Sequence, residues 1–220
     1  MIALLLDLDG TLVDSDHLHH AAFCDVLVEA GRAPIPMADY KARIMGQPNA
    51  EIAGWLFPGD PQGHARVDRK EALFRARLGA RVEPVSGVAA LLDWAGANGA
   101  RTAVVTNAPR ANALAMLAAA GLDGRLPELV VAEECVRPKP DPAPYVEAMR
   151  RLGATPSRSV AFEDSRSGIR AARAAGALTF GMTTGLAAAE LLQAGAHHAI
   201  PDFTAPALAA ALATLKATVA

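Results

Sequence analysis

The stretch that decides the fold of this chain is its first, Met1-Ile-Ala-Leu-Leu-Leu-Asp7-Leu-Asp9-Gly10-Thr11-Leu-Val-Asp14-Ser15. The apolar run before Asp7 is too short for a helix and ends in acids and a glycine, which is typical of a strand buried on both faces of a parallel sheet. Asp7 and Asp9 point to the same side in an extended backbone. Gly10 then lets the chain turn sharply out of the sheet.

Two carboxylates at the end of such a strand predict a divalent metal site. Open α/β sheets bind ligands beyond the carboxyl ends of their strands. Asp7 and Asp9 repel each other there unless a cation or a proton lies between them. Taken alone, the stretch also fits a simple Asp-Gly turn or a helix N-cap. An EF-hand calcium loop is disfavoured because Thr11 and Leu18 stand where oxygen ligands would fall.

Length and composition indicate an ordinary globular protein. The chain has 220 residues, 52% of them hydrophobic, which suffices for one large domain or for one domain with a modest insert. Its 21 basic and 23 acidic residues produce no field that would attract nucleic acid or a membrane surface. Neither a signal-peptide core nor a membrane span is evident, and the two cysteines lack regular spacing. We expect a cytoplasmic monomer.

The pattern after Pro84 is a regular alternation of helices and strands, which predicts an α/β fold, a Rossmann-like parallel sheet core flanked by helices. Strands are expected at 102–105, 129–132, 159–162, 177–180 and 198–200. Helices are expected after Ser86 and Pro109, at 143–152 and 166–175, and from Ala205. The segment between Ser15 and Val82 shows no convincing strand. We therefore expect a core of residues 1–14 and 83–220 and an inserted small helical cap of residues 15–82.

The cap is expected to contain a helix from Ser15 to about Ala30, shorter helices at 37–45 and 49–56, and a charged helix ending near Leu78. His17, His19 and His20 lie in the first of these, with Cys24 four residues further on. They resemble a metal cluster, but the absence of a second group of ligands at a zinc-like spacing favours hydrogen-bonded or solvated histidines. The charged helix is interpreted mostly as a solvated face.

Polar residues recur at the other strand ends. Thr106 and Asn107 place a hydroxyl and an amide where a strand leads into a helix, a natural anion cradle without the glycines of a P-loop. Lys139 stands between prolines, which restrict its direction. Glu163 and Asp164 form a second acidic pair at a strand end. Helix caps and a rigid loop are the structural alternatives for the individual motifs.

Together these motifs resemble those of the haloacid dehalogenase superfamily, in its capped branch of phosphatases and β-phosphoglucomutase-like enzymes. The resemblance covers nearly the whole chain. Asp7-Leu-Asp9-Gly10-Thr11, Thr106-Asn107, Lys139 and Glu163-Asp164 follow in the family's order. It implies Asp7 as the nucleophile that becomes an aspartyl phosphate and Asp9 as general acid and base. Mg²⁺ would be bound by Asp7, Asp9 through its backbone carbonyl, and Asp164.

The same resemblance implies that Thr106 and Asn107 bind the phosphoryl group and that Lys139 neutralises charge beside Asp7. Secondary candidates are Glu163, His19, Asn49, Lys70 and Arg110. Sugar phosphomutases often carry arginine about where Asn49 stands, which lowers the mutase interpretation. Lys70 or Arg110 would have to bind a second phosphate in a mutase, and for both we favour a solvated position.

We therefore expect a Mg²⁺-dependent phosphatase acting on a small phosphorylated metabolite, of the sugar phosphate or phosphoglycolate type. The alternatives are a sugar phosphomutase that uses the same phosphoaspartate and, less favoured, a non-enzymatic binding protein on the same fold. Metal and lysine would cancel the repulsion between the attacking carboxylate and the phosphate. The second aspartate and the metal argue against a dehalogenase, whose displacement at carbon needs neither.

Overall fold

A computed structural model describes residues 1–217, which fold around one six-stranded parallel sheet with the strand order β3-β2-β1-β4-β5-β6. The first strand, β1, lies between β2 and β4. The predicted α/β class is confirmed. The strands are β1 (Ala3–Leu6), β2 (Arg101–Thr106), β3 (Glu128–Val131), β4 (Ser159–Glu163), β5 (Leu178–Met182) and β6 (His198–Ile200).

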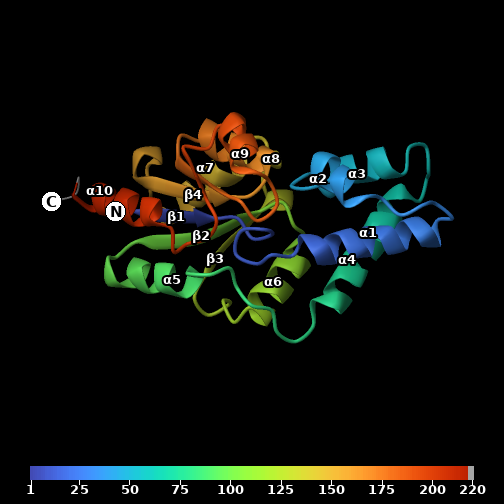
Figure 1. Ribbon diagram of the computed structural model, residues 1–220, viewed down its shortest axis with the longest axis horizontal. Coiled ribbons are helices and arrows are strands. Elements are labelled where there is room, and N and C mark those ends of the chain that lie inside the picture. The colour runs from blue at the N-terminus through green and yellow to red at the C-terminus, as the bar shows by residue number, and fades with distance from the viewer. Residues whose placement is uncertain (218–220) are drawn as a thin grey trace.

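Helices cover both faces of the sheet, with α5 and α6 on one side and α7, α8 and α9 on the other (Figure 1). None of the helices within residues 1–217 is both long and apolar enough to cross a membrane. These core helices are α5 (Val88–Ala97), α6 (Arg110–Ala119), α7 (Ala143–Leu152), α8 (Arg166–Ala174), α9 (Ala188–Ala194) and α10 (Pro206–Ala217).

The side chains of β1 alternate between two apolar clusters, which explains why this strand is apolar at every position. Leu4 and Leu6 belong to the cluster that contains residues of α5, α6 and α10. Ala3 and Leu5 belong to the cluster on the opposite face, with residues of α7 and α8. All four are completely buried. Such burial on both faces is what a central parallel strand requires.

Residues 16–78 form α1 (Asp16–Glu29), α2 (Met37–Arg43), α3 (Asn49–Leu56) and α4 (Gly63–Leu78), which lie together beyond one edge of the sheet (Figure 1). They share an apolar cluster that includes Phe23, Ile52 and Val67 and extends to Ile169 and Leu191 of α8 and α9. The two chain segments that join these helices to the sheet run side by side, because Val13 bridges Pro84.

Several boundaries differ from the sequence-based expectation. Helix α9 was not predicted; its seven residues are too few to show a clear apolar period. Strands β2, β4 and β5 extend to Thr106, Glu163 and Met182, one or two residues beyond the predicted ends. Ser15 precedes α1 as predicted but makes no side-chain capping bond. The predicted last helix is observed as α10, and its continuation past Ala217 lies outside the described residues.

The central position of β1 predicts a large cost for truncating one of its side chains. Leu4→Ala should lower the free energy of unfolding by about 2–5 kcal/mol, because Leu4 is completely buried and a cavity would remain. Leu114→Ala on α6 is the matched control, since 51% of Leu114 is exposed and the change should stay within about 0.5 kcal/mol. Urea unfolding measures both. Equal losses would contradict the assignment of β1 to the core.

Candidate active site

The carboxyl ends of the three central strands bring the predicted motifs to one edge of the sheet. Leu6 of β1 is in register with Val104 of β2 and Phe162 of β4. The Asp7 N–H donates to the Phe162 carbonyl at 3.0 Å, which extends this pairing by one residue. Asp7, Thr106 and the Glu163–Asp164 pair therefore lie at the same level, although some 150 residues of chain separate the first from the last.

Lys139 is the buried centre of this edge. Only 2% of it is exposed. Its ammonium donates to Asp7 Oδ1 at 2.6 Å, to the Val105 carbonyl at 2.6 Å and to Glu163 Oε1. Burial opposes the charge, but Asp7 and Glu163 outweigh this effect and raise the pKa of Lys139 to about 12. The lysine is therefore a permanent cation with all three donors used.

Glu163 is the second counter-ion of Lys139, and its carboxylate is fixed from several sides. The Tyr145 hydroxyl donates to Oε1 at 2.5 Å, and the Ser165 hydroxyl donates to Oε2 at 3.3 Å. Burial, followed by the charge of Glu163, raises the pKa of Tyr145, which keeps its hydroxyl a donor. A Cβ atom on Gly168 would lie 1.9 Å from a Glu163 oxygen, so only glycine fits there.

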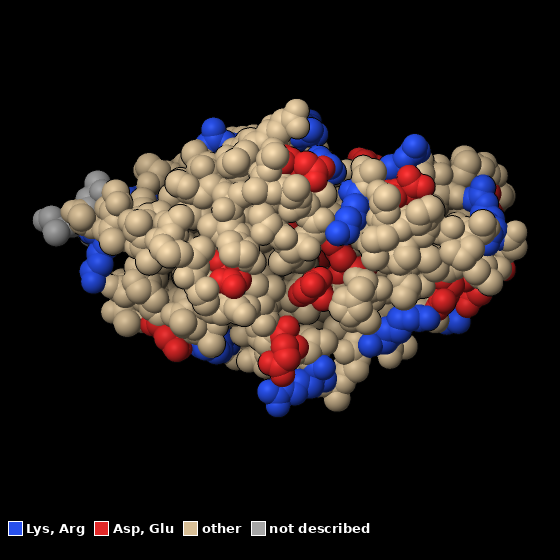
Figure 2. All heavy atoms as spheres, viewed as in Figure 1, with Lys and Arg blue, Asp and Glu red and all other residues tan. Residues whose placement is uncertain are grey.

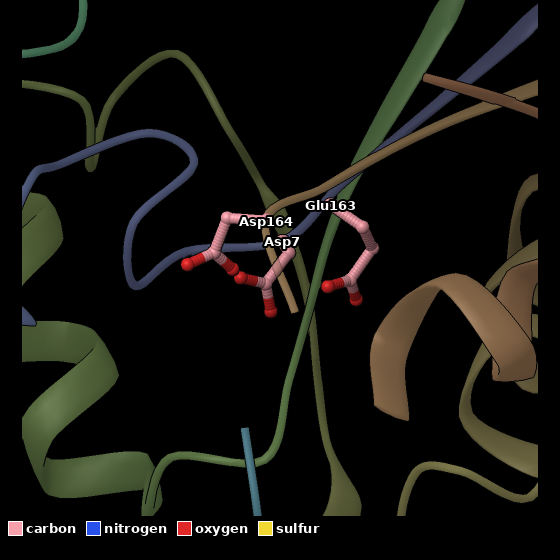
Figure 3. Close-up of side chains that lie close together, drawn as sticks. All are labelled: Asp7, Glu163 and Asp164. Carbon is pink, nitrogen blue, oxygen red and sulfur yellow. The ribbon is translucent and has the colours of Figure 1, made fainter. Parts of the chain in front are cut away.

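Asp7 and Asp164 form the acidic pair that faces the open side of the edge. Their carboxylates point toward each other, and Glu163 lies apart from them (Figure 3). Burial raises the pKa of both, assisted by the charge of Glu163 on Asp7 and by the charge of Asp7 on Asp164. Asp7, Glu163 and Asp164 each offer an oxygen within 4.8 Å of one another. Buried carboxylate oxygens that repel each other fit a hard divalent cation such as Mg²⁺.

Among the described residues, the Asp9 carboxylate is not part of the acidic cluster of Asp7, Glu163 and Asp164. It accepts hydrogen bonds from the Ser15 hydroxyl at 2.6 Å and from His19 Nε2 at 2.7 Å. Burial alone would raise the pKa of Asp9, but His19 and the two hydrogen bonds lower it overall. Ser15 thus binds Asp9 instead of capping α1. The predicted hydrogen-bonded state of the histidines is observed for His19.

A second polar cluster faces Asp9 from α1, α3 and α4. Lys70 donates to His19 Nδ1 at 2.7 Å and to Glu71 at 3.0 Å, and only 3% of Lys70 is exposed. The expectation of a solvated Lys70 is therefore wrong: α4 turns this position toward the site because Lys70 and Phe74 lie one helical turn apart, and Phe74 stacks on His19. Arg110 lies at the surface, paired with Glu134.

Glu71 completes this second cluster and was not singled out in the sequence. It accepts from Asn49 Nδ2 at 2.8 Å and from Asn112 Nδ2 at 2.6 Å. Burial would raise its pKa, but Lys70, His19 and the hydrogen bond from Asn49 lower it, so Glu71 is a carboxylate. Glu71 is one acid among many on a charged helix, and Asn112 belongs to a distant helix. No local pattern marks either residue.

Thr106 and Asn107 reach the edge as predicted, and both already have partners. Thr106 Oγ1 accepts from the Ala108 N–H at 2.9 Å. The Asn107 amide exchanges hydrogen bonds with the backbone of Lys139 and also donates to the Gly46 carbonyl at 3.1 Å. Ser167 donates to the same Gly46 carbonyl at 2.7 Å. The loop after α2 is thereby joined to the end of β2 and to the first turn of α8.

Both polar clusters open into one cavity of about 80 Å³. Figure 2 shows acidic and basic side chains near the junction between the sheet and α1–α4. Apolar residues of the segment 16–78, among them Phe23, Ile44 and Ile52, contribute to the lining of the cavity. The polar residues of the lining include Asp7, Asp9, His19, Asn49, Lys70, Glu71, Thr106, Asn107, Lys139 and Asp164.

Comparison with known proteins agrees with this geometry. Residues 1–176 match the family model described as haloacid dehalogenase-like hydrolase. The chain belongs to this family. It is 34% identical over 178 residues to the fructose-1-phosphate phosphatase YqaB of Escherichia coli, covering 79% of this chain and 92% of YqaB. It is 33% identical over 175 residues to a phosphoglycolate phosphatase of Xylella fastidiosa, covering 79% of this chain and 76% of that protein.

A solved relative has the same fold. The CbbY protein of Rhodobacter sphaeroides, as a mutant in complex with xylulose-(1,5)bisphosphate, superposes with a TM-score of 0.81 at 28% identity. The match covers 92% of this chain and 95% of that one. The predicted membership of the haloacid dehalogenase superfamily is confirmed.

The close approach of Gly10 to Asp164 predicts a specific effect of adding one methyl group. Gly10 has φ +69°, and a Cβ atom there would lie 2.0 Å from Asp164 Oδ2. Gly10→Ala should displace Asp164 and abolish Mg²⁺ binding measured by calorimetry. Gly31→Ala is the control, since Gly31 has φ +70° and open space around it, and it should cost only about 1–2 kcal/mol. Retained Mg²⁺ binding in Gly10→Ala would contradict this role of Gly10.

Proposed function

We propose that this protein is a Mg²⁺-dependent phosphatase that hydrolyses a small phosphomonoester, such as a sugar phosphate or phosphoglycolate, through an aspartyl-phosphate intermediate. The observation that supports it most directly is the contact of the buried Lys139 ammonium with Asp7, whose carboxylate also faces Asp164. The relatives named fructose-1-phosphate and phosphoglycolate phosphatase support the same reaction class. The proposed partner is a small phosphorylated metabolite. We propose that the protein acts in the cytoplasm as a monomer.

Asp7 is the proposed nucleophile. Its Oδ1 accepts from Lys139, which leaves the other oxygen, on the side of Asp164, to attack phosphorus. Formation of the aspartyl phosphate divides one slow displacement into two easier ones. Lys139 offsets the repulsion between this carboxylate and the anionic ester. Thr106 and Asn107 are proposed to bind the phosphoryl oxygens, which requires Asn107 to exchange its bond to Gly46 for one to the substrate.

Asp9 is the proposed general acid and base. In its protonated form it would donate a proton to the leaving alkoxide, and the resulting carboxylate would then remove one from the water that hydrolyses the intermediate, a role that contributes about 10²- to 10⁴-fold. Ser15 and His19 orient its carboxylate. The Asp9 side chain lies outside the acidic cluster, which suits a group that moves protons and binds metal only through its backbone carbonyl.

Mg²⁺ would be bound by Asp7, Asp164 and the Asp9 carbonyl. When bound, it supplies a Lewis acid that neutralises charge on the phosphoryl oxygens. The raised pKa of Asp164 follows from its burial beside the charge of Asp7. A cation would remove this repulsion and keep both groups ionised.

Residues 15–82 are proposed to act as a cap that closes over the site and excludes water, with hinges near 12–16 and 81–86. The two hinge segments are joined by the Val13–Pro84 bridge, so they can move together. The bonds of Gly46 to Asn107 and Ser167 would then belong to the closed state.

The mutase alternative has less support. A mutase must bind a second phosphate, yet Lys70 is paired with Glu71 and Arg110 with Glu134, and Asn49 donates to Glu71. A binding protein without activity is disfavoured because Asp7, Asp9, Lys139 and Asp164 are all present and assembled. Release of inorganic phosphate, in place of interconversion of hexose phosphates primed by a bisphosphate, distinguishes a phosphatase from a mutase.

Metal removal tests the proposed reaction. Purified protein assayed with a panel of phosphomonoesters should release phosphate with Mg²⁺, lose this activity in EDTA and regain it when Mg²⁺ is restored. The metal is expected to be essential because the carboxylates of Asp7 and Asp164 would repel each other without it. Undiminished turnover after chelation, checked by elemental analysis for residual metal, would refute the metal requirement.

Replacement of the nucleophile tests the intermediate. Asp7→Asn should lower kcat by at least about 10³-fold, because an amide cannot form the phosphoaspartate. The fold should survive, since the amide oxygen can still accept from Lys139 and Glu163 still balances its charge. Asp123→Asn, a change at an exposed loop acid, serves as control with full activity. Near-normal activity of Asp7→Asn with a normal melting temperature would show that another group attacks phosphorus.

A further inference from the structure

The cap side of the cavity contains a carboxylate that the proposed chemistry does not use. Glu71 is 5% exposed and lines the cavity together with Lys70 and Asn49. Its Oε2 accepts from Lys70 at 3.0 Å and from Asn112 at 2.6 Å, while Oε1 accepts from Asn49 at 2.8 Å. Donors from α3, α4 and α6 therefore fix both oxygens in place. A carboxylate so constrained is a preorganised acceptor.

Two of the three N–H donors of Lys70 are already used. An ammonium has three N–H groups. Two of them serve His19 Nδ1 and Glu71, and the nitrogen lies 4.4 Å from the centroid of the Phe23 ring and 5.6 Å from that of Phe74. The rings thus occupy the remaining direction as cation–π partners. The positive charge of Lys70 is balanced by the Glu71 carboxylate.

Lys139, the other lysine of the cavity, is also paired with carboxylates. Within residues 1–217, the lysines and arginines that line the cavity are Lys70 and Lys139. Lys139 is shared by Asp7 and Glu163. A leaving group that carried a second negative charge would therefore meet the Glu71 carboxylate without a free cation to compensate it. Desolvating such a charge unpaired is costly.

A neutral polyol fits the same surroundings. A carboxylate offers about four acceptor sites, and Glu71 uses three of them in the contacts above. A sugar hydroxyl can donate to the remaining site on Oε1. Phe23, Ile44 and Ile52 supply an apolar wall to the same cavity, against which the C–H face of a sugar can pack. The carboxylate of Glu71 and these apolar side chains together match the polar and apolar faces of a polyol.

We propose that Glu71 is a specificity-determining residue, which accepts a hydroxyl of a neutral polyol leaving group and disfavours leaving groups that carry a second anion. The inference rests on the proposed phosphatase function and narrows its substrate class to polyol monophosphates, with phosphoglycolate and bisphosphates as poor substrates. The residue acts on the leaving group, so its effect falls on discrimination between esters.

Two matched substrate pairs test this selectivity. 2-Hydroxyethyl phosphate and 2-phosphoglycolate differ mainly in a hydroxyl against a carboxylate, and fructose 1-phosphate and fructose 1,6-bisphosphate differ in one phosphate. The wild type should favour the ester with the less charged leaving group, 2-hydroxyethyl phosphate or fructose 1-phosphate, by at least about tenfold in kcat/KM. This ratio corresponds to the free energy of about one hydrogen bond to a charged group. Glu71→Gln should reduce this ratio about tenfold, mainly through KM, because the amide removes the opposing charge and frees Lys70.

Controls separate selectivity from damage to the site. p-Nitrophenyl phosphate, whose leaving group has no hydroxyl donor, measures any change that Glu71→Gln makes to the attack on phosphorus, and the kcat/KM values of the other esters are compared with it. Glu51→Gln, a charge change at an exposed position of α3, should leave every ratio unchanged. Asn49→Lys adds a cation beside Glu71 and should raise activity on both anionic esters about tenfold.

The outcomes are distinguishable. Equal or better wild-type turnover of the anionic esters overturns the assignment of Glu71, and this result needs no variant to fold. Unchanged ratios in both Glu71→Gln and Asn49→Lys, with normal p-nitrophenyl phosphate hydrolysis, overturn it as well. If the wild type releases phosphate from none of the esters with Mg²⁺ present, the proposed phosphatase function fails and this inference fails with it.

Discussion

The buried Lys139 ammonium is the constraint on which the site depends. It lies between Asp7 and Glu163 and also donates to the Val105 carbonyl, so one cation joins β1, β2 and β4 beneath the edge of the sheet. Without it, three buried carboxylates would face one another. Removing either acid would leave buried charge poorly compensated, and such losses are expensive. In the proposed mechanism, the same contact offsets the repulsion between Asp7 and an anionic ester.

Close packing of small residues makes this concentration of charge possible. Gly10 and Gly168 bring backbone against the carboxylates of Asp164 and Glu163, where a methyl group would collide with an oxygen. Tyr145 packs from α7 and directs its hydroxyl at Glu163. Each acid therefore has a fixed direction, and the pair that remains free to bind a metal is Asp7 with Asp164.

The helices α1–α4 supply polar side chains to the site. His19 of α1 contacts Asp9, and Lys70 of α4 contacts His19, so the proposed acid–base residue is connected through a buried chain to the Glu71 carboxylate. The proposed proton transfer at Asp9 and the proposed recognition of the leaving group at Glu71 would thus occur in connected parts of the cavity. This arrangement suits a reaction in which the group that is recognised is also the group that is protonated.

The α/β class and the burial of β1 on both faces could be predicted from the sequence, because they follow from local apolar runs. The four motifs of the family could also be recognised, because each is a short pattern at a strand end. The sequence also indicated that Asp7, Thr106, Lys139 and Asp164 would meet, since parallel strands end at a common edge.

The remaining contacts of the site could be seen only in the folded chain. Lys70 was expected in solvent and is buried, and Glu71, Asn112 and Tyr145 carried no local signal. Their roles depend on how α4 and α6 rotate against each other and on which side of α7 faces the sheet. Such orientations arise from packing between segments far apart in the chain, whereas the pattern of a single helix shows only that some face is buried.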